Sequence, residues 1–291
     1  MKISDFKTRA WQSTRRAEKY SKATGSKADL SFMMAESYLD VLGGYAAAGA
    51  KVLDMGCGTG VISLALADLG YQVTAVDISN EMLEQLKQSM GDRSIEISQG
   101  NIFSLPVADG SFDAIISRWV LPHFPQWPLA VIEASKKLKP GGVLLFDICS
   151  ARNVELAWEK GPIPASFGYG FGKTADAQAY YAHVSRAELE LVAESAGLRL
   201  EMLQPLGFFR ANAVIASALG EDDYASYKTE LERFFKGDQV TEFVTWFETV
   251  VTPRLPLPMT TEAIVVLCKP ENSSAAREIA SGLKAWVRRW K

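Results

Sequence analysis

A glycine-rich turn, DMGCGTG, is the feature that most restricts how this chain of 291 residues can fold. The apolar pair Val52 and Leu53 precedes the turn, and apolar residues at helical spacing follow it from Val61 until Gly70. Glycines let a ligand approach the backbone, and a helix N-terminus offers unpaired amides to it. A strand, a glycine turn and a helix in this order therefore predict an α/β domain with a ligand site after its first strand.

The remainder of the chain alternates short apolar runs with helical patterns, which is typical of a parallel sheet with crossover helices. The patterns predict strands at residues 52–53, 72–76, 94–98, 114–117, 143–148, 198–203 and 263–268. They predict helices at residues 61–69, 80–90, 128–138 and 185–197, the last with a capping-box sequence at its start.

The spacing of the glycines indicates which ligand the turn suits. Gly56, Gly58 and Gly60 spell GxGxG, whereas the dinucleotide fingerprint has its third glycine one residue later, where this chain has Val61. An oxidoreductase that binds a dinucleotide pyrophosphate is therefore disfavoured. Asp77 ends the next predicted strand, where a carboxylate can accept hydrogen bonds from both hydroxyls of a ribose. An adenosine ligand without a pyrophosphate fits these residues.

Four segments in order carry a family resemblance: VLDMGCGTG, VTAVDIS, GNIFSLPVADGSFDAIISRWVLPHF and LKPGGVLLFD. This series resembles the motifs of class I S-adenosylmethionine-dependent methyltransferases of the small-molecule type. The resemblance implies a Rossmann-like α/β sheet of seven strands, parallel except for the last, with helices on both faces. It implies S-adenosylmethionine as cofactor, S-adenosylhomocysteine as product, and a cofactor site at the carboxyl ends of the first two strands.

The same resemblance implies roles for individual residues. The expected cofactor contacts are Asp54, Gly56 and Gly58 at the methionine end, Asp77 at the ribose, Ile78, Asn101 and Ile102 at the adenine, and Arg118 and Trp119 near the transferred methyl. Tyr20 joins them, because AWQSTRRAEKY is similar to the helix that folds over the cofactor in this family. Asn101 departs from the family's usual aspartate, so it can still accept a hydrogen bond but carries no charge.

The catalytic candidates are the two histidines, because a hydroxyl acceptor gains from a base whose pKa lies near the working pH. His123 directly follows the fourth predicted strand, where the resemblance places the methyl group, and we expect it to act as a base or to orient the substrate. A purely structural His123 is the alternative. His183 is the weaker candidate, although Tyr180 and Tyr181 beside it could bind an acceptor. Cys57, with no histidine near it in sequence, is expected to pack rather than to react.

The chain is expected to divide into four parts. Residues 1–50 form an N-terminal helical lid segment, and residues 51–204 together with 262–270 form the cofactor-binding core. Residues 205–261 insert a helical cap between the last two strands, or else a layer that only packs. The long segment 150–184 contains Phe167, Tyr169 and Phe171, which suit either a mobile flap or an ordered surface loop.

Residues 271–291 are expected to form an amphipathic helix, because Ile279, Leu283, Trp286, Val287 and Trp290 fall on one face and basic residues on the other. Such a helix binds an anionic membrane surface or a partner, including a second copy of the chain, or packs on its own domain.

The amino-acid composition excludes several classes of function. Lys and Arg number 31 against 34 for Asp and Glu, without a basic block, which disfavours a nucleic-acid-binding protein. Three widely separated cysteines suit neither a zinc site nor a disulfide framework, so no metal is expected. The N-terminal residues have no apolar signal-peptide core, so we expect a cytoplasmic enzyme. Peripheral contact with a membrane surface is compatible with this location.

The function hypothesis is methyl transfer from S-adenosylmethionine to oxygen or nitrogen of a small-molecule or lipid-linked acceptor. An inactive protein that binds the same cofactor and regulates a partner is the alternative. No NPPY-like tetrapeptide follows the fourth predicted strand, which disfavours an amino-methyltransferase acting on adenine bases or glutamine.

Overall fold

The computed structural model describes residues 30–162, 170–171, 180–209, 212–234 and 238–271. Its centre is an eight-stranded sheet whose main path runs β3-β2-β1-β4-β5-β10-β9, with β8 paired to β5 outside that path. The strands are β1 (Lys51–Met55), β2 (Gln72–Asp77), β3 (Ile95–Gln99), β4 (Phe112–Ser117), β5 (Leu138–Ser150), β8 (His183–Val184), β9 (Arg199–Leu206) and β10 (Glu262–Cys268).

The directions of the strands confirm the predicted fold class. β1, β2, β3, β4 and β5 pair in parallel, and β10 is antiparallel to both β5 and β9. Each of the seven predicted strands is present, with bounds that differ from the prediction by up to five residues. The prediction of seven strands misses β8, whose two residues pair in parallel with the end of β5.

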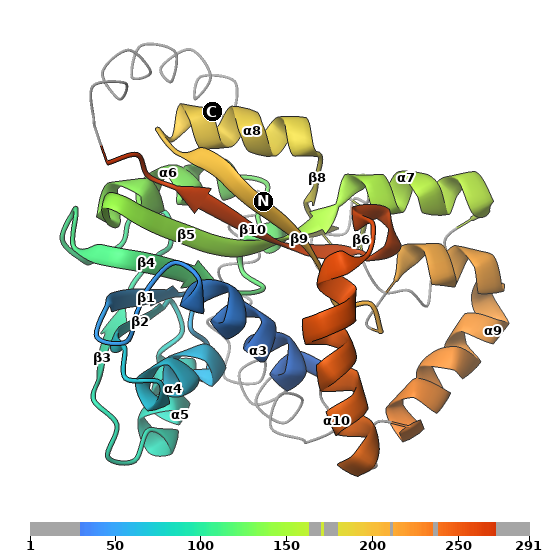
Figure 1. Ribbon diagram of the computed structural model, residues 1–291, viewed down its shortest axis with the longest axis horizontal. Coiled ribbons are helices and arrows are strands. Elements are labelled where there is room, and N and C mark those ends of the chain that lie inside the picture. Colours follow the sequence, from blue (N-terminus) through green and yellow to red (C-terminus); the bar gives the residue numbers. More distant parts are fainter. Residues whose placement is uncertain (1–29, 163–169, 172–179, 210–211, 235–237, 272–291) are drawn as a thin grey trace.

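Helices cover both faces of the sheet (Figure 1). On one face lie α3 (Leu30–Gly43), α4 (Val61–Asp68) and α5 (Asn80–Ser89), and on the other lie α6 (Trp127–Lys137) and α8 (Arg186–Ser195). A separate apolar core lies on each face. Side-chain caps confirm two of the predicted helix starts, because Ser79 accepts from the Met82 amide and Ser185 forms the full capping box with Glu188.

The long segment after β5 has structure of its own. α7 (Ala151–Lys160) begins directly after β5, with the Ser150 hydroxyl accepting from the Asn153 amide. Further along, β6 (Gly170–Phe171) pairs with β7 (Tyr180–Tyr181). The sequence patterns did not predict α7, because its start depends on this single cap rather than on a long apolar stripe.

Helices also fill the segment between β9 and β10. α9 (Ala213–Phe234) is kinked at Gly220 and packs against α7, and α10 (Asp238–Trp246) continues into a π-helical turn at Phe247–Val251. Within α10, Val244 is fully buried, whereas Phe243 is 49% exposed.

Glu248 joins this helical segment to the sheet. Its buried carboxylate accepts hydrogen bonds from the backbone amides of Gly207, Phe208 and Phe209, directly after β9. α7, α9 and α10 lie beyond the carboxyl ends of the parallel strands (Figure 1), so they stand beside the edge where a ligand is expected.

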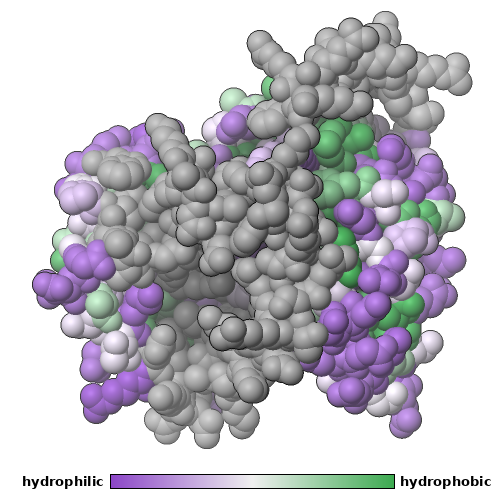
Figure 2. All heavy atoms as spheres, turned by 180° about the vertical axis from the view of Figure 1, so that it is seen from behind, coloured by the Kyte–Doolittle hydropathy of each residue, from purple (hydrophilic) through white to green (hydrophobic). Residues whose placement is uncertain are grey.

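Several predicted features lie outside the described residues. These are Tyr20, the aromatic residues Phe167 and Tyr169, and the amphipathic helix apart from Glu271. In the described part of the chain, no helix has both the length and the apolar character that crossing a membrane requires. Where described residues are visible from behind, their surface is mainly hydrophilic with scattered hydrophobic side chains (Figure 2).

The glycine turn offers a matched test of its packing. Gly56 and Gly70 both have a φ of +81°, but a Cβ on Gly56 would lie 2.4 Å from Val120 Cγ2, whereas one on Gly70 would lie 3.8 Å from Ala48. Gly70→Ala should lower the free energy of unfolding by about 1–2 kcal/mol through backbone strain alone. Gly56→Ala should lower it by about 1–3 kcal/mol more, because β-branched Val120 cannot easily turn away. Urea denaturation measures both, and equal losses would contradict the close contact.

Candidate active site

The glycine turn is tied to the neighbouring strand. Gly56, Gly58 and Gly60 all have positive φ, as the turn between β1 and α4 requires. The backbone amides of Gly56 and Cys57 donate to the Val76 carbonyl at 2.7 and 3.1 Å. The turn is therefore held against the end of β2, where Asp77 follows.

Asp77 lies at this turn, as its place in the sequence predicts. Its two carboxylate oxygens accept hydrogen bonds from the backbone amides of Gly58 and Ser79, each at 2.9 Å. Burial raises the pKa of this carboxyl, and the two amides oppose that rise. Each oxygen keeps a further lone pair, so Asp77 can accept from the hydroxyls of a ligand while it holds the turn.

A buried charged pair lies at the end of β1 and β4. Asp54 is 2% exposed, and its carboxylate accepts from the Ser63 hydroxyl at 2.5 Å. Burial raises the pKa of Asp54 to about 6, against the opposing effects of Ser63 and of the positive charge of Arg118. Arg118 is 8% exposed, and its Cζ lies 4.1 Å from the centre of the Trp119 ring.

Arg118 provides the test of whether an S-adenosylmethionine fits. Its Nε and Nη2 atoms are buried and make no hydrogen bond. Buried donors without acceptors are costly, and a carboxylate satisfies two guanidinium donors at once. The cofactor carries a carboxylate at its methionine end, so Arg118 fits this group in charge and in hydrogen-bonding capacity. Val120 packs on Gly56, which places the segment after β4 directly against the glycine turn.

The expected adenine contacts are spread around the end of β3. Asn101 is exposed, and its side-chain oxygen already accepts from the Phe103 amide at 3.0 Å. Ile102 is buried, and Ile78 is half-buried. The local turn at Asn101 therefore competes with an adenine amino group for the same oxygen, and the roles of these three residues stay predictions.

His123 and the segment after the long loop meet at the carboxyl ends of β4 and β5. His123 is 6% exposed, and its ring centroid lies 4.7 Å from that of Tyr181. The Ala182 amide donates to the Pro122 carbonyl at 2.7 Å, which fixes this contact. His183 pairs with Cys149 of β5, and burial lowers its pKa to about 4, so it is neutral at pH 7.

Two further acids and a tyrosine belong to this edge, although the sequence patterns did not single them out. Asp147, on β5, is 2% exposed and accepts through Oδ1 from the Tyr38 hydroxyl at 2.9 Å and from the Trp119 amide at 2.5 Å. Glu262, on β10, accepts from the Trp119 indole at 3.3 Å. The signal that could have identified Asp147 and Glu262 is that each is the single acidic residue in an otherwise largely apolar strand.

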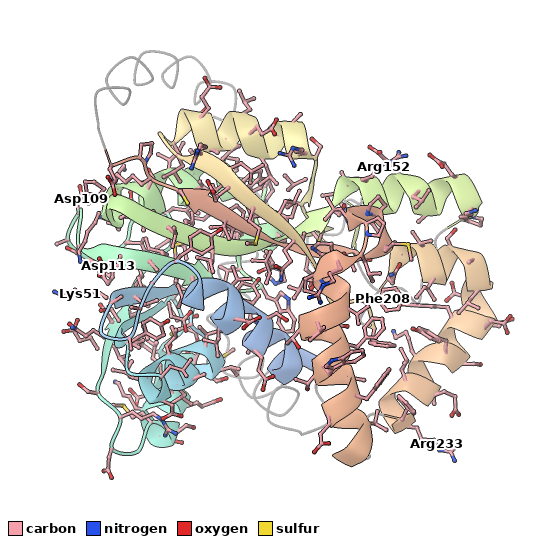
Figure 3. All side chains as sticks on the ribbon, in the orientation of Figure 1. Lys51, Asp109, Asp113, Arg152, Phe208 and Arg233 are labelled. Carbon is pink, nitrogen blue, oxygen red and sulfur yellow. The ribbon has the colours of Figure 1, made fainter. Side chains whose placement is uncertain are left out.

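The surroundings of Asp113 and Cys57 indicate structural roles for both residues. Asp113 accepts from the Lys51 amide and from the Lys139 side chain at the entrance of β4. Figure 3 shows Asp113 and Lys51 at one end of the sheet and Phe208 at the other. Burial raises the pKa of the Cys57 thiol, which disfavours the thiolate a nucleophile needs. Among the described residues, no three His, Cys, Asp or Glu side chains are grouped to hold a metal ion.

The buried acids predict how stability depends on pH. Burial and the nearby Glu262 raise the pKa of Asp147 to about 7 from an ordinary value of 3.8. Between about pH 4 and 7 the folded chain therefore binds more protons than the unfolded chain, so its free energy of unfolding falls as pH rises. Asp147→Asn, which keeps an acceptor oxygen but does not titrate, should show a smaller fall in urea denaturation at pH 4.5 and 7.5.

Asp113→Asn is the matched control for this measurement, because the pKa of Asp113 is lowered and it stays ionised across that window. An unchanged pH dependence in Asp147→Asn would contradict the raised pKa.

Comparison with known proteins assigns the central part of the chain to a domain family. Residues 53–146 match the family described as Methyltransferase domain. A ubiquinone biosynthesis O-methyltransferase of Xanthomonas campestris is 41% identical over 102 residues, which cover 34% of this chain and 42% of that protein. A malonyl-[acyl-carrier protein] O-methyltransferase of Erwinia pyrifoliae is 36% identical over 113 residues, 38% of this chain and 42% of that protein. The chain thus spans less than half the length of these two relatives.

Solved structures extend the likeness of fold. An S-adenosylmethionine-dependent methyltransferase from Thermotoga maritima superposes with a TM-score of 0.55 at 17% identity, over 88% of this chain and 97% of that one. A chain of the complex that contains the Trm112 methyltransferase activator of Haloferax volcanii superposes with a TM-score of 0.56 at 17% identity. The match covers 90% of this chain and 97% of that one. Residues 53–146 therefore carry a methyltransferase domain, and the chain has the fold of S-adenosylmethionine-dependent methyltransferases.

Proposed function

We propose that this chain transfers a methyl group from S-adenosylmethionine to oxygen or nitrogen of a small-molecule or lipid-linked acceptor. The observation that carries the proposal is the buried Arg118, whose Nε and Nη2 atoms lack acceptors beside a glycine turn closed by Asp77. A carboxylate for Arg118 and a ribose for Asp77 are both parts of this one cofactor.

The residues of the turn bind and orient. When bound, the cofactor supplies a methyl group on a positively charged sulfur, and the sulfur leaves as an acceptor attacks the methyl carbon in line. Asp77 would accept from the ribose hydroxyls, and Arg118 would pair with the carboxylate at the other end. Holding both ends would orient the cofactor, and displacement of this kind gains most from such positioning away from water. Asp54, which accepts from the Ser63 hydroxyl, interacts with the positive charge of Arg118 and so favours its position.

The acceptor side is formed by His123 and Tyr181, at the carboxyl ends of β4 and β5. A hydroxyl acceptor loses its proton as the methyl group is transferred, and the proposed base that takes this proton is the imidazole of His123. A structural His123 would instead only pack against Tyr181.

Oxygen is the acceptor atom that the relatives favour, because both named relatives are O-methyltransferases. The names of these relatives point to different acceptors, one in ubiquinone biosynthesis and one a malonyl-[acyl-carrier protein], so phenols and carboxylic acids are the first classes to assay. An inactive cofactor-binding protein would bind S-adenosylhomocysteine but consume no donor with any of them.

Asp77 gives the direct test of cofactor binding. Asp77→Asn removes the negative charge but keeps a similar shape, and loss of a charged hydrogen bond costs about 1.5–3 kcal/mol. The affinity for S-adenosylhomocysteine, measured by isothermal titration, should therefore fall by about tenfold or more. Asp113→Asn, at the far end of the sheet, should bind like the unaltered chain. Tighter binding of NAD than of S-adenosylhomocysteine would contradict the proposal.

His123 gives the test of base catalysis. His123→Ala should lower turnover by about 10²- to 10⁴-fold, as expected for loss of a general base, without weakening S-adenosylhomocysteine binding. Release of S-adenosylhomocysteine with the best phenol measures turnover, because a carboxylic acid is already ionised near pH 7 and needs no base. A loss of only a few-fold with intact cofactor binding would show that His123 is structural.

A further inference from the structure

Trp119 has an unusual backbone conformation. Among the described residues other than glycine, it alone has a positive φ, +54°. Side chains clash with the following carbonyl in this left-handed region, so only a strong local interaction maintains it outside glycine. Trp119 lies directly after β4, between Arg118 and Val120.

One carboxylate supplies that interaction. Asp147 Oδ1 lies 2.5 Å from the Trp119 amide nitrogen, within the range of a charge-assisted hydrogen bond. The Tyr38 hydroxyl, from α3, donates to the same oxygen and orients the carboxylate. Glu262 accepts from the indole at 3.3 Å, so the backbone and the ring of Trp119 are held by different acids.

The conformation of Trp119 determines where its two neighbours lie. Arg118 stacks on the Trp119 ring, and Val120 packs on Gly56 of the glycine turn. If the peptide at Trp119 relaxed to a negative φ, the directions of both neighbours would change, and with them the position of the unpaired nitrogens of Arg118.

Stability alone does not account for Asp147. It is buried next to a second buried carboxylate, Glu262, and both raise the cost of keeping charge away from water. A buried carboxylate that costs stability is explained when it holds another group in a geometry the chain would not adopt unaided.

We propose that Asp147 is a positioning residue: it holds Trp119 in the left-handed conformation that places Arg118 for cofactor binding. The inference rests on the proposed function, because Arg118 is taken to meet the carboxylate of S-adenosylmethionine.

A double-mutant cycle tests this role. Trp119→Ala and Trp119→Gly both lack the indole, but only glycine adopts a positive φ without strain. With Asp147 present, the two variants should bind S-adenosylhomocysteine within about threefold of each other in isothermal titration. When each is combined with Asp147→Ala, the alanine variant should bind about tenfold more weakly than the glycine variant. Asp147→Asn alone, which keeps an acceptor oxygen, should bind nearly as the unaltered chain.

Equal effects of Asp147→Ala in the alanine and glycine backgrounds would overturn the inference, since Asp147 would then act independently of the conformation at residue 119. Urea denaturation of each variant reports folding. If Asp147→Ala is poorly folded, Asp147→Leu fills the volume without offering an acceptor and takes its place. Loss of folding in both backgrounds with both substitutions would also overturn it, because the carboxylate would then serve the fold. No binding of S-adenosylhomocysteine by the unaltered chain would instead overturn the proposed function.

Discussion

The hydrogen bond from the Gly58 amide to Asp77 is the interaction on which the rest of the site depends. It joins the glycine turn after β1 to the end of β2, and so fixes where the backbone of the turn faces. The same carboxylate has lone pairs left for a ligand, so one residue both shapes the cradle and lines it. Substituting it should therefore affect binding more than the loss of a single contact would suggest.

Burial of charge is the second constraint at this edge. Asp54, Arg118, Asp147 and Glu262 are each less than a tenth exposed, at the ends of four neighbouring strands. Each of the three acids accepts from at least one donor, Ser63, Tyr38 or Trp119, whereas two nitrogens of Arg118 have no acceptor. This imbalance is what a ligand with a carboxylate would correct, and it gives the site a preference that the glycine turn alone lacks.

Local patterns predicted the fold and the cradle. The strand–turn–helix order, the GxGxG spacing and the acid at the end of the next strand act over about 20 residues, and the structure brings Gly58 and Asp77 into contact as that spacing suggests. The capping box at Ser185 is likewise local, and it is formed. The antiparallel last strand followed from the family resemblance, and β10 confirms it.

Contacts between distant segments could not be predicted in this way. The Asp147–Trp119 bond and the His123–Tyr181 contact depend on how β5 and the segment after the long loop return to the end of β4. No periodicity encodes that return. Asn101 shows that a local contact can also differ from the prediction. The Phe103 amide, two residues away, donates to the side-chain oxygen that the family resemblance assigns to adenine.

A crystal structure of the chain with S-adenosylhomocysteine tests the central claim most directly. The ribose hydroxyls are expected within hydrogen-bonding distance of Asp77, and the methionine carboxylate is expected on the Nε and Nη2 atoms of Arg118. A ligand bound away from the glycine turn, or bound there with Arg118 still lacking an acceptor, would contradict it.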